Sequence, residues 1–319
     1  MKYLKEFSDG DRFNGIYFCK SKITATTKNG KTYFNVTLQD KSGTMDAKIW
    51  DVKSDAINEF DAKDYIDINA EVSLYNGSLQ AVIRRLRVAG EDEYNEADYL
   101  PTSRYNNAAM YESLLKFVSF VEDPYYSKLL NHFFVEDTEI VNTFKKMSAA
   151  KSIHHGFIGG LLEHTLGVAR LCQVYTKAYT FLNRDLLLTA ALLHDIGKLK
   201  ELSLFPENDY TDEGQLLGHI SIGVEMIHDA CKNIEGFPLE LENQLKHCIL
   251  AHHGELEFGS PKKPALVEAV ALSLADLTDA RMESFREILD ANSENDEWFG
   301  FNRIFDSNLR KTRTYDKKE

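Results

Sequence analysis

The sequence of 319 residues has few cysteines, and none of the four belongs to a CxxC pair. Cys19, Cys172, Cys231 and Cys248 are therefore expected to be buried free thiols, which excludes a disulfide framework and a thiolate zinc cluster. No apolar run approaches the roughly 20 residues that span a bilayer. The first residues, MKYLKEFSDGDRF, contain no apolar core typical of a signal peptide. We expect a cytoplasmic protein that has no membrane partner.

Phosphate-binding glycine motifs and an excess of positive charge are also absent. The sequence contains neither a Walker loop nor GxGxxG, so it gives no sign of a P-loop or dinucleotide site. Its net charge of −13 opposes tight, sequence-blind binding of nucleic acid by the chain as a whole. The acidic excess is uneven, because residues 1–90 hold 14 basic and 12 acidic residues and the remaining residues hold 23 and 38. A polyanion is therefore compatible with the N-terminal part.

Residues 13–89 alternate between apolar and polar side chains in the pattern of β-strands. The pattern predicts a strand from Ile16 and further strands over residues 32–38, 45–50, 65–74 and 79–88, with hairpin turns at Asn29-Gly30 and Asn76-Gly77. One short helix is expected over residues 52–60. Five strands with a helix between the third and fourth are the plan of an OB-fold, a small barrel whose face binds oligonucleotides. Residues 1–90 are therefore predicted to be an all-β OB-fold domain.

Single strands bind to aromatic rings that stack on bases and to cations that contact phosphates. The candidate rings are Tyr17, Tyr33, Phe34, Trp50 and Tyr75, and the candidate cations are Lys20, Lys22, Lys28, Lys31, Arg84, Arg85 and Arg87. About half of the strand aromatics in a small barrel face its core, and strand lysines often only block edge pairing. For any single residue a structural role is thus the simpler explanation, but the set favours nucleic-acid binding. The substrate contacts we select are Tyr33, Phe34, Trp50, Lys31 and Arg85.

The rest of the chain is predicted to be helical. Residues 91–105 are acidic, contain one proline and are interpreted as a linker. Helical periodicity begins at Asn106, and breaks at Pro124, Asp137 and Ser148 divide the following residues into short helices. Residues 106–319 are thus expected to form an all-α domain that ends in a basic tail.

The apolar segment LLLTAALLHDIGK, at residues 186–198, is predicted to form a buried helix that Asn183 caps. It ends in His194 and Asp195, and Gly197 could end the helix in the left-handed conformation. Burying a carboxylate is unfavourable unless a partner or a metal ion compensates it. A salt bridge would explain this dipeptide alone, whereas a metal site would require further ligands.

Further candidate ligands share one kind of position, at the end or on the buried face of an apolar helix. They are His164, His219, His252, His253 and Asp276. Nitrogen and oxygen donors without thiolates suit Mn, Fe, Co, Ni or Zn. A single histidine is more often structural than a ligand. Five imidazoles and two carboxylates in such positions nevertheless predict a metal site.

The ordered set H…HD…H…HH…D, with HDIGK at its centre, resembles the HD-domain metal-dependent phosphohydrolases. The string HHGFIGGLLEHTLGVA, together with HDIGK and AHHG, resembles more closely the YhaM-type 3′-to-5′ exoribonucleases, in which an OB-fold precedes the HD domain. The HD resemblance covers about residues 152–280. It implies an enzyme that degrades single-stranded RNA, with DNA left open, from the 3′ end to nucleoside 5′-monophosphates.

The resemblance also implies roles for the candidate ligands at two divalent transition-metal ions, for which Mn is favoured. The first ion would be held by His164, His194, Asp195 and Asp276, and the second by Asp195, His219, His252 and His253. Asp195, as the bridging ligand, and Lys198 are the predicted catalytic residues. Lys198 lies where it could meet a phosphate oxygen, although a solvated lysine at a helix end explains it equally.

His154 and His155 match the family string at the start of the segment that leads to His164. They could contact substrate or a second shell around the metal, and a partly exposed pair at a helix start explains them equally. The polar residues 201–214 are expected to border the ions and to shape the substrate entrance.

Two other functions are compatible with parts of the sequence. An HD-type nucleotide or cyclic-dinucleotide phosphohydrolase would need no strand-binding domain, and the GYP tripeptide usual for the cyclic-dinucleotide class is missing near HDIGK. A single-strand-binding accessory protein with a structural metal site is disfavoured by the complete ligand set. The sequence leaves homo-oligomer formation open.

Overall fold

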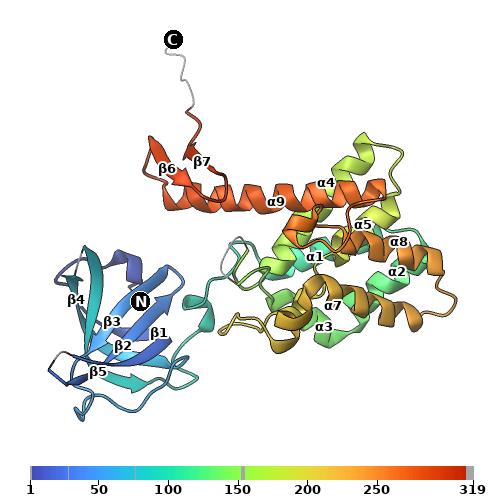
Figure 1. Cartoon of the computed structure of the whole chain (residues 1–319). Helices are drawn as coiled ribbons and strands as arrows, with labels where there is room; N and C mark the ends of the chain where they lie inside the picture. Colours follow the sequence, from blue (N-terminus) through green and yellow to red (C-terminus); the bar gives the residue numbers. More distant parts are fainter. Residues whose placement is uncertain (1, 28, 76, 152–154, 314–319) are drawn as a thin grey trace. The chain divides into compact units, whose positions relative to one another are not determined.

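The computed structural model describes residues 2–27, 29–75, 77–151 and 155–313 (Figure 1). The chain divides into two compact units. The first comprises Met1–Arg104 and Phe205–Glu207, and the second comprises Tyr105–Leu204 and Asn208–Glu319. Each unit has its own cluster of buried apolar side chains.

Five strands form a closed barrel in the first unit. They are β1 Arg12–Thr26, β2 Thr32–Asp40, β3 Gly43–Ile49, β4 Tyr65–Tyr75 and β5 Ser78–Val88. Their order around the barrel is β1-β2-β3-β5-β4, in which β3 and β5 pair in parallel and the other neighbours pair antiparallel. Closure removes the unpaired strand edges that would otherwise favour aggregation. The predicted five-stranded OB-fold is confirmed.

The prediction of a helix over residues 52–60 is wrong, because this segment forms turns. The Ser54 hydroxyl accepts a hydrogen bond from the Ala56 amide, and such local bonds compete with helical ones. Ile57 forms a single bridge with Leu86 of β5, and Phe60 is buried in the barrel core. Side chains that enter the core thus hold the segment in an irregular path.

Residues 91–104, most of the predicted linker, lie against the barrel. The ring of Tyr94 stacks on that of Tyr65, with centroids 3.7 Å apart. The Gln39 side chain donates a hydrogen bond to the Tyr99 carbonyl, and Leu100 is buried. The acidic composition of this segment therefore does not keep it away from the barrel.

The second unit is helical. Its helices are α1 Asn107–Ser119, α2 Pro124–Asn131, the π-helical turn η3 His132–Glu136, α3 Thr138–Lys146, α4 Gly160–Ala178, α5 Arg184–Leu193, α6 Lys198–Glu201, α7 Asp212–Lys232, α8 Leu239–Leu250, the short η4 Leu256–Phe258 and α9 Val267–Ala291. The side chains of Asn106, Asp123, Asp137 and Asn183 accept hydrogen bonds at the helix starts that the sequence predicted. The predicted helical domain is thereby confirmed.

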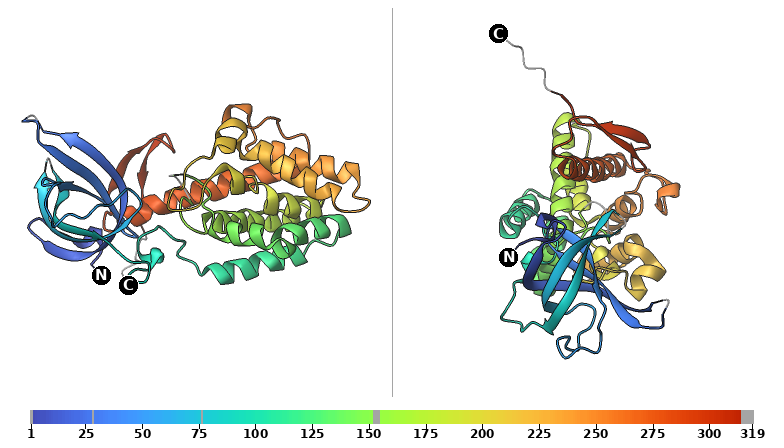
Figure 2. Two further views of the ribbon diagram at one scale, coloured as in Figure 1. Left: turned by 90° about the horizontal axis from the view of Figure 1, so that it is seen from below. Right: turned by 90° about the vertical axis from the view of Figure 1, so that its left-hand side faces the viewer.

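A C-terminal hairpin is the one addition to the predicted all-α plan among the described residues. Strands β6 Trp298–Asn302 and β7 Ser307–Arg310 follow the long helix α9, as both views in Figure 2 show. The hairpin includes the first residues of the predicted basic tail. Lys311 and Arg313 form ion pairs with Asp296 and Glu297.

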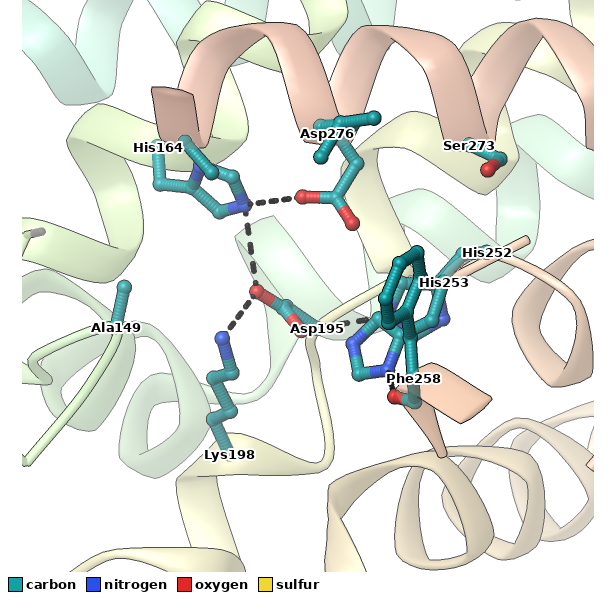
Figure 3. Close-up of a pocket in the computed structure, with 11 residues that line it drawn as sticks. Ala149, His164, Asp195, Lys198, His252, His253, Phe258, Ser273 and Asp276 are labelled. Atoms are coloured by element: carbon teal, nitrogen blue, oxygen red, sulfur yellow. Dashed lines mark hydrogen bonds and ion pairs between the residues drawn. The ribbon is translucent and has the colours of Figure 1, made fainter. Parts of the chain in front are cut away.

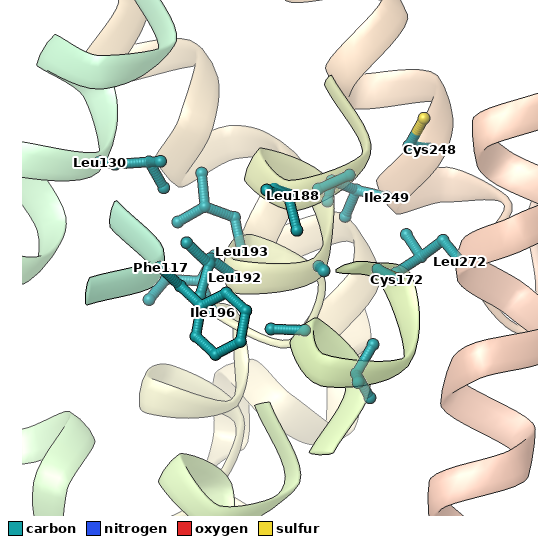
Figure 4. Packing of buried hydrophobic residues seen from close by; sticks show 14 of the residues in the cluster. Phe117, Leu130, Cys172, Leu188, Leu192, Leu193, Ile196, Cys248, Ile249 and Leu272 are labelled. Atoms are coloured by element: carbon teal, nitrogen blue, oxygen red, sulfur yellow. The ribbon is translucent and has the colours of Figure 1, made fainter. Parts of the chain in front are cut away.

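Helix α5 lies at the centre of the helical core (Figure 4). All eight residues from Leu186 to Leu193 are buried, and α5 packs against α2, α4, α8 and α9. Full burial of each leucine contributes about 1.5–3 kcal/mol, so the position of this helix is firmly fixed. His194 and Asp195 follow directly after its last turn, so the packing of α5 also fixes where they lie.

The cysteines and the helices can be compared with the composition. All four cysteines are buried and free, as predicted. Within the described residues, every helix is too short or too polar to cross a membrane.

Candidate metal centre and nucleic-acid surface

The structure brings together seven side chains that lie as far apart in the sequence as residues 164 and 276. Their positions are His164 on α4, His194 and Asp195 in the turn after α5, His219 on α7, His252 and His253 in the turn after α8, and Asp276 on α9. Figure 3 shows several of them around one cavity of about 480 Å³, which Lys198, Phe258 and Ser273 also line. Five of the seven predicted ligands line this cavity, and the other two, His194 and His219, lie beside Asp195, so all seven belong to one site.

The first cluster contains His164, His194 and Asp276, whose ligand atoms lie within 4.8 Å of one another. The Nε2 atom of His164 lies 3.1 Å from His194 Nε2 and 3.2 Å from Asp276 Oδ1. Burial lowers the pKa of His164, but Asp276 and Asp279 together raise it to about 10. The cluster therefore stabilises a positive charge at this point.

All five imidazole rings are held by a hydrogen bond at the same nitrogen, Nδ1. Each Nδ1 atom lies 2.7–2.9 Å from an oxygen that can only accept, so each Nδ1 carries a proton. The acceptors of His164, His194, His219, His252 and His253 are, in that order, Asp279, the Ala191 carbonyl, Glu201, the Ile249 carbonyl and the Phe258 carbonyl. With the proton on Nδ1, the neutral form of each ring has its lone pair on Nε2, the tautomer that binds a metal ion.

Asp195 stands between the first cluster and a second cluster formed by His219, His252 and His253. Its Oδ2 atom lies 3.3 Å from His194 Nε2 and 3.5 Å from His164 Nε2. Its Oδ1 atom lies 3.4 Å from His219 Nε2 and 3.8 Å from His252 Nε2. One carboxylate thus offers one oxygen to each cluster.

Three buried atoms of the site have no hydrogen-bond partner among the described residues. They are Asp195 Oδ1, His219 Nε2 and His252 Nε2. Leaving such an atom unsatisfied costs about 1–3 kcal/mol. Because all three are acceptors that face one another, a cation satisfies them together, and the donor set fits a divalent metal ion.

The protonation states of His252 and Asp195 also fit metal binding. Burial and the neighbouring His253 hold the pKa of His252 well below its usual value, which keeps this imidazole neutral. Burial opposes ionisation of Asp195, but Lys198 and His194 hold its pKa well below the usual range. Neutral imidazole and ionised carboxylate are the forms that bind metals.

Gly197 serves a different purpose from the one predicted. Its φ of −63° is right-handed, and it begins α6 rather than ending α5 in the left-handed conformation. A Cβ atom at this position would overlap the carbonyl oxygen of His219. Glycine is therefore required because α7 approaches this turn closely, and the approach places His219 beside Asp195.

Glu201 is a functional residue that the sequence analysis missed as such. Its Oε1 atom accepts hydrogen bonds of 2.9 Å from both the amide and the Nδ1 of His219. Neither Glu201 nor the rest of the loop 201–214, which was expected to shape the substrate entrance, lines the cavity described above. The sequence signal that could have identified Glu201 was its position three residues after Lys198, at the end of α6.

Lys198 and the two histidines before α4 differ in their relation to the cavity. Lys198 lines it, and its Nζ lies 2.7 Å from Asp195 Oδ2. His155 is only 2% exposed and contacts Asp279, so it lies behind the site instead of being partly exposed. His154 lies outside the described residues.

On the barrel, Tyr33 and Trp50 form an aromatic pair that suits base stacking. Their ring centroids are 4.8 Å apart at 30°, and Trp50 is 40% exposed. The Nζ atom of Lys48 lies 5.1 Å from the Tyr33 centroid. Lys31 and Arg85 are exposed. These four predicted contacts are accessible to a strand.

Other predicted contacts on the barrel are less available. Tyr17 is buried in the barrel core. Phe34 is partly buried and packs against this core, where its ring contacts that of Phe60. Successive side chains of a strand point to opposite faces, and residues 34, 36 and 38 of β2 all face the core, which explains why Phe34 faces inward. Arg87 forms ion pairs with Asp67 and Glu93. Lys28 lies outside the described residues.

Comparisons with known proteins agree with both halves of the structure. Residues 161–281 match the HD domain, and residues 20–89 match an OB-fold nucleic acid binding domain. The chain is 34% identical over 276 residues to the 3′-5′ exoribonuclease YhaM of Bacillus velezensis, with 86% of each chain covered. The chain belongs to the YhaM family. Its HD domain implies dependence on a divalent metal.

Two solved structures resemble part of this YhaM-family chain. One is the second OB-fold domain of replication protein A from Methanococcus maripaludis, at 14% identity and a TM-score of 0.23, covering 28% of this chain and 95% of that one. The other is the mitochondrial single-stranded DNA binding protein Rim1 from S. cerevisiae, at 11% identity and a TM-score of 0.20, covering 26% and 97%. These scores are too low to support a conclusion about function.

Proposed function

We propose that this chain is a metal-dependent 3′-to-5′ exoribonuclease that degrades single-stranded RNA to nucleoside 5′-monophosphates. The observation that carries the proposal is the convergence of five imidazoles and two carboxylates, in two clusters with Asp195 between them. The relative from Bacillus velezensis, a 3′-5′ exoribonuclease, supports this reaction and its direction.

In this proposal the site holds two divalent ions. The first ion is held by His164, His194, Asp195 and Asp276, and the second by Asp195, His219, His252 and His253. When bound, the ions supply Lewis-acid stabilisation of the phosphodiester and an activated water. Mn²⁺ is our preferred ion, since nitrogen and carboxylate donors without thiolates suit it.

The chain's own residues position the substrate. Lys198 reaches into the cavity as a point charge, where its Nζ can meet a non-bridging phosphate oxygen while it stays beside Asp195. The cavity of about 480 Å³ has room for a terminal nucleotide. Tyr33 and Trp50 stack on bases further along the strand. We therefore assign strand capture to residues 1–90 and cleavage to residues 106–319.

The test uses one single-stranded RNA labelled at its 5′ end or at its 3′ end, incubated with Mn²⁺ or with EDTA. We expect the 3′ label to leave at once as a mononucleotide and the 5′-labelled strand to shorten stepwise, with Mn²⁺ only. Asp195→Ala should abolish both signals because it removes the oxygens that face both clusters.

His132→Ala is the matched control, since His132 lies in the η3 turn and packs against Phe133. It should cleave at the wild-type rate. Unchanged cleavage by Asp195→Ala, or equal cleavage in EDTA, would contradict the metal-dependent reaction. Internal cuts at the earliest time points would contradict the exonuclease.

A further inference from the structure

His164 is held by a side chain that belongs to the helix of another ligand. Its Nδ1–H donates to Asp279 Oδ2 over 2.8 Å, while its Nε2 faces the first cluster. Asp279 follows Asp276 by three residues on α9, so the two carboxylates lie on the same face of that helix. One helix therefore contributes both a candidate ligand and the partner that orients its neighbour (Figure 3 shows Asp276 facing His164).

Asp279 is itself held from the other side by His155. The Nε2 atom of His155 lies 3.1 Å from Asp279 Oδ2, and both histidine side chains are 3% exposed. His155 has a φ of +59°, which an L-residue adopts only under constraint. A Cβ at Gly160 would overlap the carbonyl oxygen of His155, so a glycine is needed at this position too.

Gly167 makes room for the carboxylate. It lies inside α4, three residues after His164, where glycine is unfavourable relative to alanine. A Cβ at Gly167 would overlap the Asp279 carboxylate. Three locally unfavourable features, namely a left-handed histidine, a helix-interior glycine and a largely buried acid, thus meet at one carboxylate.

We propose that Asp279, held by His155 and accommodated by Gly167, is a positioning residue that fixes the ring of His164 with Nε2 toward the first metal ion. The hydrogen bond keeps the proton on Nδ1 and prevents rotation of the ring. The inference rests on the proposed function, because it requires an ion at His164. Nothing in it requires Asp279 to contact the ion or the RNA.

The test is a Mn²⁺ titration of the metal-free, full-length protein by calorimetry, with bound metal measured by mass spectrometry. Wild type is expected to bind two ions. Asp279→Ala should weaken one of them by about 10–100-fold and leave the other unchanged. Asp279→Asn keeps an oxygen that can accept from His164 Nδ1, so it should recover part of the affinity.

A double-mutant cycle separates this role from general packing. Gly167→Ala alone should also weaken one ion, because its methyl group displaces the Asp279 carboxylate. Combined with Asp279→Ala it should cause no further loss, since the group that it displaces is gone. Asp290→Ala, on an exposed part of the same helix, is the control and should titrate like wild type.

The outcomes distinguish this inference from the proposed function. A wild-type protein that binds no Mn²⁺ overturns the proposed function. A wild-type protein that binds two ions, with Asp279→Ala binding both at the same affinity, overturns the positioning role alone. If wild type binds three ions and Asp279→Ala binds two, Asp279 is itself a ligand, and this result also overturns the positioning role. If Asp279→Ala does not fold, His155→Phe, which keeps ring volume and removes the donor, replaces it and should show the same selective loss.

Discussion

At the scale of residues, the site depends on which nitrogen of each imidazole faces the two clusters. The backbone carbonyls of Ala191, Ile249 and Phe258 hold three imidazoles, and the acids Glu201 and Asp279 hold two. These bonds use every Nδ1, so each ring turns its Nε2 atom toward the site, where an ion can bind it. Asp195 is the residue on which the whole arrangement depends, because its two oxygens face different clusters.

We predict that Mn²⁺ stabilises the folded protein. An ion present at about 100 times its Kd adds about 2.7 kcal/mol to the free energy of unfolding. In a helical unit of this size that corresponds to a rise in Tm of about 5–10 °C. Differential scanning fluorimetry with and without Mn²⁺ measures the shift, and EDTA should reverse it.

Asp195→Asn tests the source of that shift. The amide keeps the side-chain volume but removes the negative charge that both clusters face, so the rise in Tm with Mn²⁺ should largely disappear. A shift as large as that of wild type would show that the ion binds elsewhere.

At the scale of elements, the site depends on close packing between the turn after α5 and helix α7. Gly218 has a φ of +73°, which breaks α7 and starts a new helical segment at His219. The carboxylate of Glu201 accepts from the first amide of this segment. Gly197 allows the segment to approach the turn. The second cluster is therefore a product of helix packing.

Gly197→Ala should disrupt this packing. The added methyl group overlaps the His219 carbonyl, and such overpacking costs about 1–3 kcal/mol of stability. As α7 moves away, His219 Nε2 withdraws from Asp195 Oδ1, so bound Mn²⁺ should fall from two ions toward one. Thermal unfolding and metal analysis measure the two effects.

Lys200→Ala is the control for this variant, because Lys200 is exposed on the same short helix α6. It should keep both the wild-type Tm and the wild-type metal content. Full metal content in Gly197→Ala would show that the second cluster does not depend on the close approach.

At the scale of the whole molecule, charge and chemistry are divided along the chain. Residues 1–90 carry a balance of 14 basic and 12 acidic residues and the exposed Tyr33–Trp50 pair. The remaining residues carry the acidic excess and all seven candidate ligands. We therefore expect a long strand to gain affinity on the barrel and a small substrate to need only the helical unit.

The double variant Tyr33→Ala/Trp50→Ala should separate these contributions. Loss of base stacking costs about 1–3 kcal/mol per base, so affinity for a long single-stranded RNA should fall at least fivefold. Hydrolysis of bis-p-nitrophenyl phosphate should remain at the wild-type rate. Leu74→Ala, an exposed apolar residue on β4, is the control for lost surface area. Unchanged RNA affinity in the double variant would remove the binding role of the pair.

Digestion should stop before paired RNA. An exonuclease must hold the chain end at the metal centre, and a cavity of about 480 Å³ cannot admit a base-paired stem. A 5′-labelled RNA with a 3′ tail and an internal hairpin should therefore shorten stepwise and pause a few nucleotides before the stem. A time course on a sequencing gel shows the pause, and smooth passage through the stem would contradict this entry path.

The sequence by itself determined the two folds and the identity of the candidate ligands. Strand alternation and two Asn-Gly turns located the barrel, because the period of two and the turn chemistry are local properties. The ligands were recognisable because imidazoles and carboxylates are unfavourable at the ends of apolar helices unless something compensates them. Asp195 and Asp276 needed no tertiary information to be identified.

Only the tertiary structure decided how those residues act. The seven candidate ligands come from five places in the chain, so their distances, the atoms without a partner and the position of Asp195 between the two clusters follow from packing alone. The same holds for Phe34, which faces the core, and for Gly197, whose role is steric. Asp279 carried a local signal, a second acid one turn after Asp276, but its contact with His164 joins residues 115 positions apart. Local patterns report burial and period, and they cannot report which distant atoms the fold brings together.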